Sequence, residues 1–565
     1  MSASTPKKNS FFGGAAILTA SVIVVKLIGA LYKIPLGWVL SDAAYADFYT
    51  AYDIYALLII ISTGGLPVAL SKMVSEANAL NRGNQVKKVF SLALAAFCLL
   101  GTASFCIMAF LPQQLADLMQ DSHAAYSILA LAPAVFFICP MSAMRGYFQG
   151  HAQMTPTAVS QVIEALCKLT IGLALASAFK KSFEDEAMAA AGAILGVSVG
   201  CLLGAVYMYF CYRRHSRAQP RCNDEPEDSR TILATLAALA IPITLSSSVI
   251  ALTNILDNAI LMGRLQDALK LSLDDARTLK GVYNKAQILY NLPTSFMVPL
   301  TASVIPHVSA ALKVKRRRQA AQISETALRT TALLAIPAGV GLFVLGEPIM
   351  RLLFSTTAEV ELAGWMLSVL GAASIAVCFM LVSNSILQAH RMVALPMATT
   401  VIGCALKLAV GYVLIGNEEI GIRGGPISTV VCFWLIALLD LFIIKRTLPR
   451  SLSLGRVFLK PAGAAAAMGA SAWAVHGLAC KAMLALGVKL KTSIFVVMDQ
   501  LGEPVLDELG KAALSRTGVA LAVFAAIGVA AVVYFALILV TKAISKEDLA
   551  LIPKGDKIAR ILRVE

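Results

Sequence analysis

Five charged side chains lie inside long apolar segments of this chain, where charge is rare. Lys26 and Lys33 are seven residues apart, which is two helical turns, so both project from one face of one helix. Asp53, Asp257 and Lys285 fall in the outer third of their segments. A charge at bilayer depth costs at least about 2.5–3.5 kcal/mol on insertion scales, so each should face a cavity or a partner. Ammonium groups in such a cavity suit an anionic ligand.

Each of these residues also has a structural interpretation. Lys33 is placed where its side chain can extend to the outer head groups. Asp53 and Lys285 are candidates for an ion pair between two helices, which would break whenever a cavity opens there. Asp257, flanked by two asparagines, suits a coupling cation or proton and suits a polar helix contact equally well.

A second charged group combines an acid with two lysines. Glu164 and Lys168 are four residues apart, in the favourable order for a helical ion pair. Lys407 occupies the position of Lys168 in a repeat described below, whereas Gly403 stands in place of Glu164. Equivalent lysines in both halves favour a structural role over contact with a ligand.

The segments that carry these residues are roughly 20 to 28 residues long, enough to cross a bilayer as hydrogen-bonded helices. Hydrophobic residues make up 58% of the chain and charged residues 14%, against roughly 45–50% and about 25% in soluble domains. The sequence therefore predicts an all-α polytopic membrane protein with about fourteen transmembrane helices. The predicted spans are residues 12–40, 48–71, 88–111, 124–147, 156–179, 187–211, 232–262, 282–311, 325–354, 363–389, 393–416, 424–445, 460–486 and 516–541.

Basic residues gather in alternate connections, for example at Lys87 and Lys88, at Arg213 and Arg214, and from Lys313 to Arg318. Cytoplasmic loops are enriched in Lys and Arg, so this pattern places both chain ends in the cytoplasm. The net charge of +15 is then a topology signal, with anionic-lipid contact as an alternative, and no nucleic-acid partner is predicted. The eleven cysteines include no close pair, so neither a disulfide nor a metal site is predicted.

The chain repeats itself faintly. Residues 163–172, IEALCKLTIG, align without gaps with residues 402–411, IGCALKLAVG, and residues 49–77 resemble residues 283–311. A parallel duplication of six helices would relate two lobes by a pseudo-twofold axis along the membrane normal. We therefore expect an N-lobe, a cytoplasmic linker, a C-lobe and two further helices with a tail, at 1–212, 213–230, 231–446 and 447–565. The long exterior loop 487–515 and the last two helices receive no predicted function.

Three stretches resemble a known family. They are KLIGALYKIPLGWVL (26–40), ISTGGLPVALSKMVSEANALNRGN (61–84) and RGYFQGHAQMTPTAVSQVIE (145–164). They are similar to the polysaccharide-export and stage V sporulation protein B branch of the multidrug/oligosaccharidyl-lipid/polysaccharide (MOP) flippase superfamily, which is related to MurJ-like lipid II flippases. The resemblance implies fourteen helices in two six-helix lobes plus two, alternating access, and a central cavity lined mainly by helices 1, 2, 7 and 8.

The resemblance also gives the intramembrane charges a ligand. It implies a flippase for an undecaprenyl-pyrophosphate-linked saccharide, a peptidoglycan precursor or another cell-envelope glycan, in the cytoplasmic membrane. In the related flippases basic residues on the first and eighth helices are important, and Lys26 and Lys285 occupy roughly those places. Lys26 and Gly29 match a pattern of a basic residue followed by xxG. Arginine is common there, and lysine offers the diphosphate a point charge in place of a bidentate fork.

Two other classes of protein compete with a flippase. A MATE-type multidrug antiporter would share the fold and should favour an acidic cavity, whereas the predicted cavity has three lysines and two aspartates. A membrane glycosyltransferase would need carboxylates or a metal on an external domain, where Asp274 and Asp275 are the candidates. We expect a transporter without a cofactor, driven by sodium ions, protons, the membrane potential or substrate flux. One chain holds both lobes, so we expect a functional monomer that contacts its lipid-linked substrate and membrane lipids.

Overall fold

The structure is a computed structural model that describes residues 8–183, 185–219, 222–355, 357, 359–390, 392, 394–447, 454–490 and 514–541. The regular elements in this part of the chain are helices, as an all-α membrane protein requires. Eleven helical segments of the described residues are long and apolar enough to cross a membrane. The polytopic helical class is therefore confirmed, and the count of fourteen spans stays a prediction.

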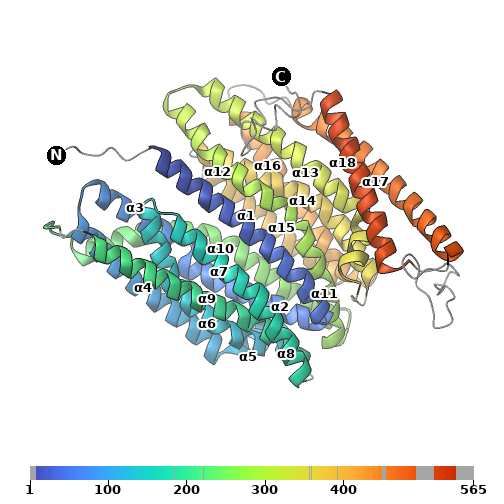
Figure 1. Ribbon diagram of the computed structural model, residues 1–565, viewed down its shortest axis with the longest axis horizontal. Helices are drawn as coiled ribbons and strands as arrows, with labels where there is room; N and C mark the ends of the chain where they lie inside the picture. The colour runs from blue at the N-terminus through green and yellow to red at the C-terminus, as the bar shows by residue number, and fades with distance from the viewer. Residues whose placement is uncertain are drawn as a thin grey trace. The chain divides into compact units, whose positions relative to one another are not determined.

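Residues Met1–Gly281 form one compact unit, called unit 1. Helix α9 contacts α2, α6, α7 and α8, and α1 lies beside α7 (Figure 1). Leu70, Phe97 and Phe148 are among the side chains buried in a core that includes α3, α4 and α6. The helices of unit 1 are α1 (Lys8–Val39), α2 (Asp42–Thr63), α3 (Leu66–Ala79), α4 (Gly83–Phe110), α5 (Pro112–Leu118), η1 (Ser122–Ala124), α6 (Ala125–Gly150), α7 (Thr155–Cys167), the π turn η2 (Lys168–Gly172), α8 (Leu173–Phe183), α9 (Glu186–Ala218), α10 (Ser229–Asp267) and the first half of α11 (Leu273–Tyr290).

Helix α10 packs against α2, α3 and α4 within unit 1. The repeat assigns this helix to the second half of the chain, whereas the contacts group it with the first half. The lobes predicted at 1–212 and 231–446 therefore remain predictions about the repeat.

Residues Val282–Glu565 form unit 2. Helix α14 contacts α12, α13 and α16, while α17 and α18 pair with each other and both contact α13. The Tyr534 hydroxyl donates a hydrogen bond to the Leu333 carbonyl over 2.7 Å, which ties α18 to α13. The two helices outside the repeat thus belong to the core of unit 2. Its helices are the rest of α11, α12 (Leu292–Lys313), α13 (Arg317–Leu353), α14 (Val360–Ala389), α15 (Ala394–Ile415), η3 (Gly421–Arg423), α16 (Gly424–Thr447), α17 (Leu454–Leu490) and α18 (Arg516–Val540).

Parts of the predicted organisation fall outside the described residues. These are residues 491–513 of the exterior loop 487–515, the first seven residues and the tail after residue 541. The cytoplasmic placement of both chain ends accordingly stays a prediction.

The internal repeat reappears in the backbone of two turns. Asn81 in the α3–α4 turn has φ 54°, and Lys315 in the α12–α13 turn has φ 58°. The next residues, Arg82 and Arg316, have φ −92° and ψ 75°, and φ −84° and ψ 64°. Each of these arginines donates its backbone N–H to a carbonyl at the end of the preceding helix over 2.9 Å. The two copies therefore close one helix and open the next with the same left-handed turn.

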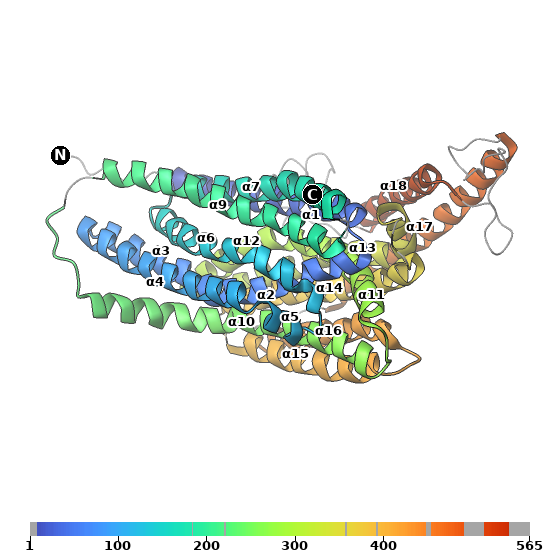
Figure 2. The ribbon, with the colours of Figure 1, turned by 90° about the horizontal axis from the view of Figure 1, so that it is seen from below.

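The segment 222–228 connects α9 to α10 and is bound to the start of α4 (Figure 2). The Asp224 carboxylate accepts hydrogen bonds from the backbone N–H groups of Asn84 and Gln85, over 2.9 and 2.8 Å. The Asn84 side chain donates to the Cys222 carbonyl, and the Gln85 side chain accepts from the Glu227 N–H. A carboxylate is favoured at this position because a helix N-terminus carries unpaired N–H groups and partial positive charge.

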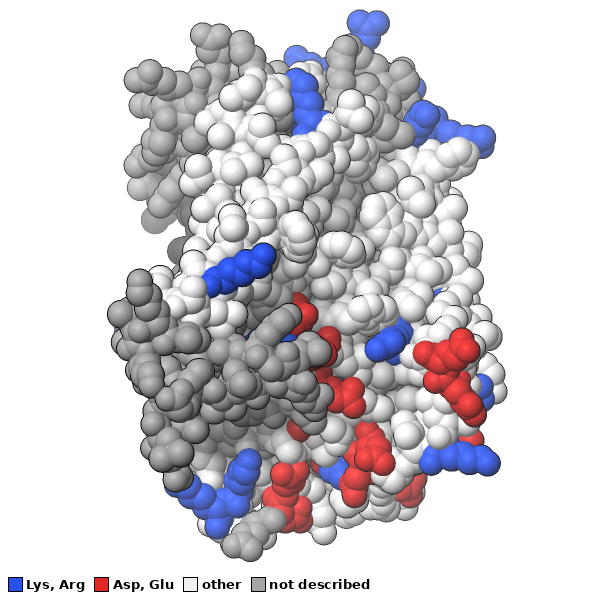
Figure 3. Space-filling view, turned by 90° about the vertical axis from the view of Figure 1, so that its right-hand side faces the viewer, with Lys and Arg blue, Asp and Glu red and all other residues white. Residues whose placement is uncertain are grey.

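Charge is separated along the helices of unit 1. Exposed acids such as Asp117, Glu186 and Asp267 lie at helix ends opposite to the basic ends of α4 and α9. Acidic side chains also gather in the lower part of the face shown in Figure 3. This distribution agrees with the gathering of basic residues in alternate connections of the sequence.

We expect Asp224→Asn to release segment 222–228 from α4. Loss of hydration acts to raise the pKa of Asp224, but hydrogen bonds from the N–H groups of Asn84 and Gln85 outweigh it, so the pKa lies below its ordinary value. The contribution to stability is then present above the ordinary aspartate pKa of about 3.9 and is lost as pH falls through the lowered value. In the wild type, slow amide exchange at residues 84–85 should persist at pH 5.

Hydrogen exchange followed by mass spectrometry checks this expectation, with exposed Glu225→Gln as the matched control. Exchange at residues 84–85 should be several times faster in Asp224→Asn and unchanged in the control. Equal protection in both variants would mean that the carboxylate does not hold the segment.

Candidate functional site

A row of aromatic side chains follows one side of α2 in unit 1. The residues are spaced three or four apart, so helical geometry stacks them along one stripe. The ring centroids of Tyr45 and Tyr49 are 5.3 Å apart, those of Phe48 and Tyr52 are 5.5 Å apart, and Tyr55 continues the row. Tyr45, Phe48 and Tyr55 are buried, whereas Tyr49 and Tyr52 are only half-buried. The row therefore contains three rings packed inside the unit and two rings that are partly accessible.

Two lysines from other elements lie on these accessible rings. The Lys33 Nζ, from α1, is 4.8 Å from the ring centroid of Tyr49. The Lys168 Nζ donates a hydrogen bond to the Tyr52 hydroxyl over 2.8 Å and lies 4.4 Å from that ring centroid. It is also 5.1 Å from the ring of Tyr32. Cation–π contact stabilises an ammonium by only about 0.5–2 kcal/mol, so the rings position both charges without neutralising them.

Neither lysine forms an ion pair within the part of the chain that the structure describes. Both are half-buried and lie on helices of a membrane protein. Intramembrane charges are rare and are usually functional. Lys33, Lys168, Tyr49 and Tyr52 therefore form the candidate functional site, called the lysine–tyrosine site.

Lys168 reaches this site from the π turn η2, which begins at that residue. Glu164 hydrogen-bonds and ion-pairs with Arg145 instead, and Arg145 Nε also donates to the Ser160 hydroxyl over 3.0 Å. The four-residue spacing predicted a contact between Glu164 and Lys168, but each side chain has another partner, Arg145 for the acid and the Tyr52 hydroxyl for the lysine. The repeat counterpart Lys407 lies in the regular helix α15 and is buried.

The other predicted site residues lie in two different units. Lys26 is exposed on α1. In unit 1 the Asn258 side chain of α10 donates a hydrogen bond to the Asp53 carboxylate of α2, and Asp257 is buried beside it in sequence. In unit 2, Lys285 is buried, and its Nζ donates to the Thr357 hydroxyl over 3.3 Å. A common cavity for these residues remains a prediction.

A buried cluster of ion pairs, which sequence reasoning missed, joins α11 to α2 in unit 1. Arg277 binds Asp47 with two parallel hydrogen bonds, from Nε to Oδ1 over 2.9 Å and from Nη2 to Oδ2 over 2.6 Å. Lys280 donates to the Thr50 hydroxyl over 2.6 Å, and Thr50 donates to Asp121 over 2.7 Å. Lys280 and Asp121 are 3.8 Å apart. Two cations thus meet two anions, and all four charged side chains are at most 5% exposed.

The signal for this cluster was present in the sequence. Arg277 and Lys280 are three residues apart and share a helix face, but they precede the predicted span 282–311 and so resemble loop residues. Helix α11 begins at Leu273, well before that span, and carries both cations into the unit. Only the fold brings Asp47 and Asp121 to them.

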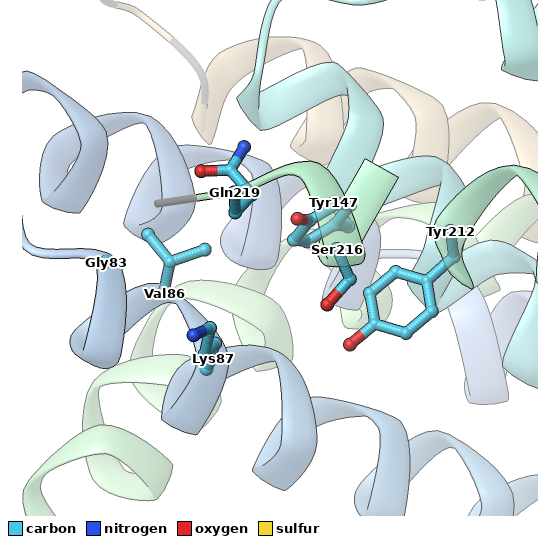
Figure 4. Close-up of a pocket in the computed structure, with 7 residues that line it drawn as sticks. All are labelled: Gly83, Val86, Lys87, Tyr147, Tyr212, Ser216 and Gln219. Carbon is cyan, nitrogen blue, oxygen red and sulfur yellow. The ribbon is translucent and has the colours of Figure 1, made fainter. Parts of the chain in front are cut away.

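Cavities elsewhere in unit 1 do not contain the lysine–tyrosine site. The pocket in Figure 4 lies between α4, α6 and α9, among residues that include Lys87, Tyr147 and Tyr212. Its volume of about 10 Å³ is close to the least that holds one water molecule. A second cavity of about 460 Å³ has a lining of mainly apolar residues that includes Leu129 and Phe179. The first is too small for a ligand head group, and the lining of the second is mainly apolar.

Known proteins share this sequence pattern and this fold. Residues 11–312 match the family model described as polysaccharide biosynthesis protein, and residues 281–413 match the model described as MatE. Stage V sporulation protein B of Bacillus subtilis (strain 168) is 24% identical over 452 residues, covering 79% of this chain and 86% of that protein. The lipid II flippase MurJ of the same organism is 25% identical over 450 residues, covering 77% of this chain and 82% of that protein.

Two solved structures resemble the fold. A lipid II flippase MurJ in an inward closed conformation has a TM-score of 0.62 at 16% identity, covering 94% of this chain and 98% of that chain. An inward-facing multidrug resistance MATE family transporter of the MOP superfamily has a TM-score of 0.60 at 14% identity, covering 75% of this chain and 98% of that chain. These likenesses concern the fold.

We predict that Asp47→Asn destabilises unit 1 by about 3–5 kcal/mol, because it leaves the Arg277 guanidinium buried without its main counter-charge. Asp274→Asn is the matched control, since Asp274 also hydrogen-bonds to Arg277, over 2.7 Å, but is 79% exposed. An exposed pair contributes only about 0–1 kcal/mol. Thermal unfolding of the purified protein in detergent measures both variants. Equal unfolding temperatures for the two variants would contradict a structural role for the buried pair.

Proposed function

Because the chain belongs to the polysaccharide biosynthesis protein family, within the MOP superfamily, we propose that it is a flippase for a lipid-linked saccharide. The substrate that best suits it is an undecaprenyl-pyrophosphate-linked saccharide, either lipid II or another cell-envelope glycan. The protein would carry this head group across the cytoplasmic membrane by alternating access. The names of its relatives, a lipid II flippase and a sporulation protein, support a transporter and not an enzyme.

The observation that carries this proposal is the lysine–tyrosine site. Its two ammonium groups lie on the rings of Tyr49 and Tyr52 and form no ion pair with the described residues. A diphosphate that enters a membrane protein loses hydration, and ammonium groups can replace the lost water. Aromatic rings hold the lysines in place and add apolar contact surface beside a sugar. The site therefore suits the junction between the diphosphate and the first sugar.

The remaining predicted residues extend this proposal. Lys26 on α1 and Lys285 on α11 would contact the diphosphate at other points of its path. Asp53 and Asp257 would take part in coupling to sodium ions, protons or the membrane potential. One chain contains both repeats, so we propose that the monomer is the functional state.

The buried cluster around Arg277 suits a gate. Its residues lie at the end of unit 1 that the charge pattern predicts to be exterior, where α2 begins and α11 begins. A buried set of ion pairs can hold that end closed, and alternating access requires such contacts to break and re-form. We propose that the cluster is the exterior closure in one state of the transport cycle.

A cation-coupled drug antiporter is the second candidate. The MatE model match and one buried acid favour it: in unit 2, the Asp440 Oδ1 accepts a hydrogen bond from Thr399 over 2.7 Å. The other oxygen, Oδ2, has no hydrogen-bond partner among the residues that the structure describes. A buried carboxylate with an unfilled position suits a proton or a cation. The two candidates differ in the ligand that they transport.

We predict that Lys33→Met combined with Lys168→Met slows flipping of a fluorescent lipid-linked saccharide by about tenfold to a hundredfold, since a hydrogen bond to a charged group contributes about 1.5–3 kcal/mol. The assay uses proteoliposomes and purified protein of equal thermal stability. Lys72→Met, which removes an exposed lysine in an i,i+4 pair, is the matched control. Lys26→Ala tests the first helix separately.

The outcomes separate the candidates. Flipping by the wild type that is lost only in the site variant supports the flippase and its site together. Wild-type flipping that the site variant retains keeps the function and rejects the lysine–tyrosine site. No flipping across several precursors, with efflux of a lipophilic cation that requires Asp440, would favour the antiporter.

A further inference from the structure

The turn between α12 and α13 in unit 2 carries an unusual concentration of positive charge. Five of its six residues from 313 to 318 are basic, and all five side chains are exposed: Lys313, Lys315, Arg316, Arg317 and Arg318. None of them forms an ion pair with a residue that the structure describes. Val314, between them, is 63% exposed. The turn therefore combines five unneutralised cations with one apolar side chain.

The repeat provides a template for what this turn can bind. The α3–α4 turn of unit 1 has the same backbone as the α12–α13 turn. The hydrogen bond that starts the next helix is also the same: Val86 N–H donates to the Arg82 carbonyl in the first copy, and Ala320 N–H donates to the Arg316 carbonyl in the second, both over 3.1 Å. In unit 1 the two N–H groups just before Val86, those of Asn84 and Gln85, bind the two oxygens of the Asp224 carboxylate. This geometry is thus an anion-binding geometry in its first copy.

The second copy has the same N–H groups and more positive charge. By the repeat, Arg318 and Gln319 stand where Asn84 and Gln85 stand in unit 1. Their backbone N–H groups make no hydrogen bond to a described residue, and the first helical residue Arg317 follows an N-cap that has no side-chain bond. The first copy is neutralised by Asp224 and by Glu227, whose carboxylate is 3.8 Å from Arg82. No described carboxylate takes that place in the second copy.

We propose that the α12–α13 turn binds the phosphate of an anionic phospholipid head group at the membrane surface. The phosphate would occupy the position that Asp224 holds in the first copy, with the arginine side chains around it. A membrane lipid is the source that fits, because the turn immediately precedes α13, a helix long and apolar enough to cross a membrane. The exposed Val314 side chain would contact the apolar part of the same surface. This inference does not depend on the transported substrate.

The test compares lipid binding by purified, delipidated full-length protein. Native mass spectrometry with phosphatidylglycerol or phosphatidylcholine added at equal concentration measures the bound fraction of each. We expect the wild type to prefer phosphatidylglycerol and the variant Arg316→Gln/Arg317→Gln/Arg318→Gln to lose that preference by about fivefold for each arginine. The matched control Arg213→Gln/Arg214→Gln/Arg217→Gln removes the same charge from exposed residues near the end of α9. This control variant should keep the preference for phosphatidylglycerol.

Three results would overturn the proposal. Equal loss in both triple variants would assign the preference to net charge, and an unchanged preference in the first variant would exclude the turn. Displacement of phosphatidylglycerol by an equal concentration of inorganic phosphate would make the turn a site for small anions only. Loss confined to the α12–α13 variant, without displacement by phosphate, supports a lipid site.

Discussion

A charge removed from water inside an apolar helical protein needs a counter-charge or hydrogen bonds, and unit 1 is organised by this requirement. At one end of the unit the buried charges are paired: Arg277 and Lys280 of α11 meet Asp47 and Asp121, and Thr50 hydrogen-bonds to both Lys280 and Asp121. Removing one partner would leave a buried charge uncompensated, so these residues bind the start of α11 to α2. The cluster also explains why the first half of α11 belongs to unit 1.

The lysine–tyrosine site leaves the same requirement only partly met. Lys33 and Lys168 contact aromatic rings and one hydroxyl, and neither forms a direct ion pair with a described residue. Rings fix the position of an ammonium while preserving its charge, which is what a binding site for a mobile anion needs. Unit 1 therefore holds two kinds of charged group. The charges of the structural cluster are paired with each other, whereas the lysines of the candidate ligand site form no ion pair with a described residue.

The duplication shows how similar backbones acquire different chemistry. The turns after α3 and α12 share dihedral angles and hydrogen-bond lengths, yet one is neutralised by Asp224 and Glu227 while the other retains five exposed cations. Lys168 and Lys407 are equivalent by sequence, but Lys168, at the start of a π turn, donates to the Tyr52 hydroxyl, whereas Lys407 is buried in a regular helix. Small local differences decide the role of each copy.

The sequence by itself determined the helical membrane class, the repeat and the family, because span length, the alternation of basic loops and motif residues are local properties. It also selected Lys33 as a site residue. The partners of Lys33 and Lys168, the π turn and the four-charge cluster came only from tertiary structure. Asp47, Asp121 and Arg277 are far apart in the chain, and no local pattern states which charges meet after packing. The four-residue spacing likewise paired Glu164 with Lys168, whereas Arg145, from another helix, lies against the acid.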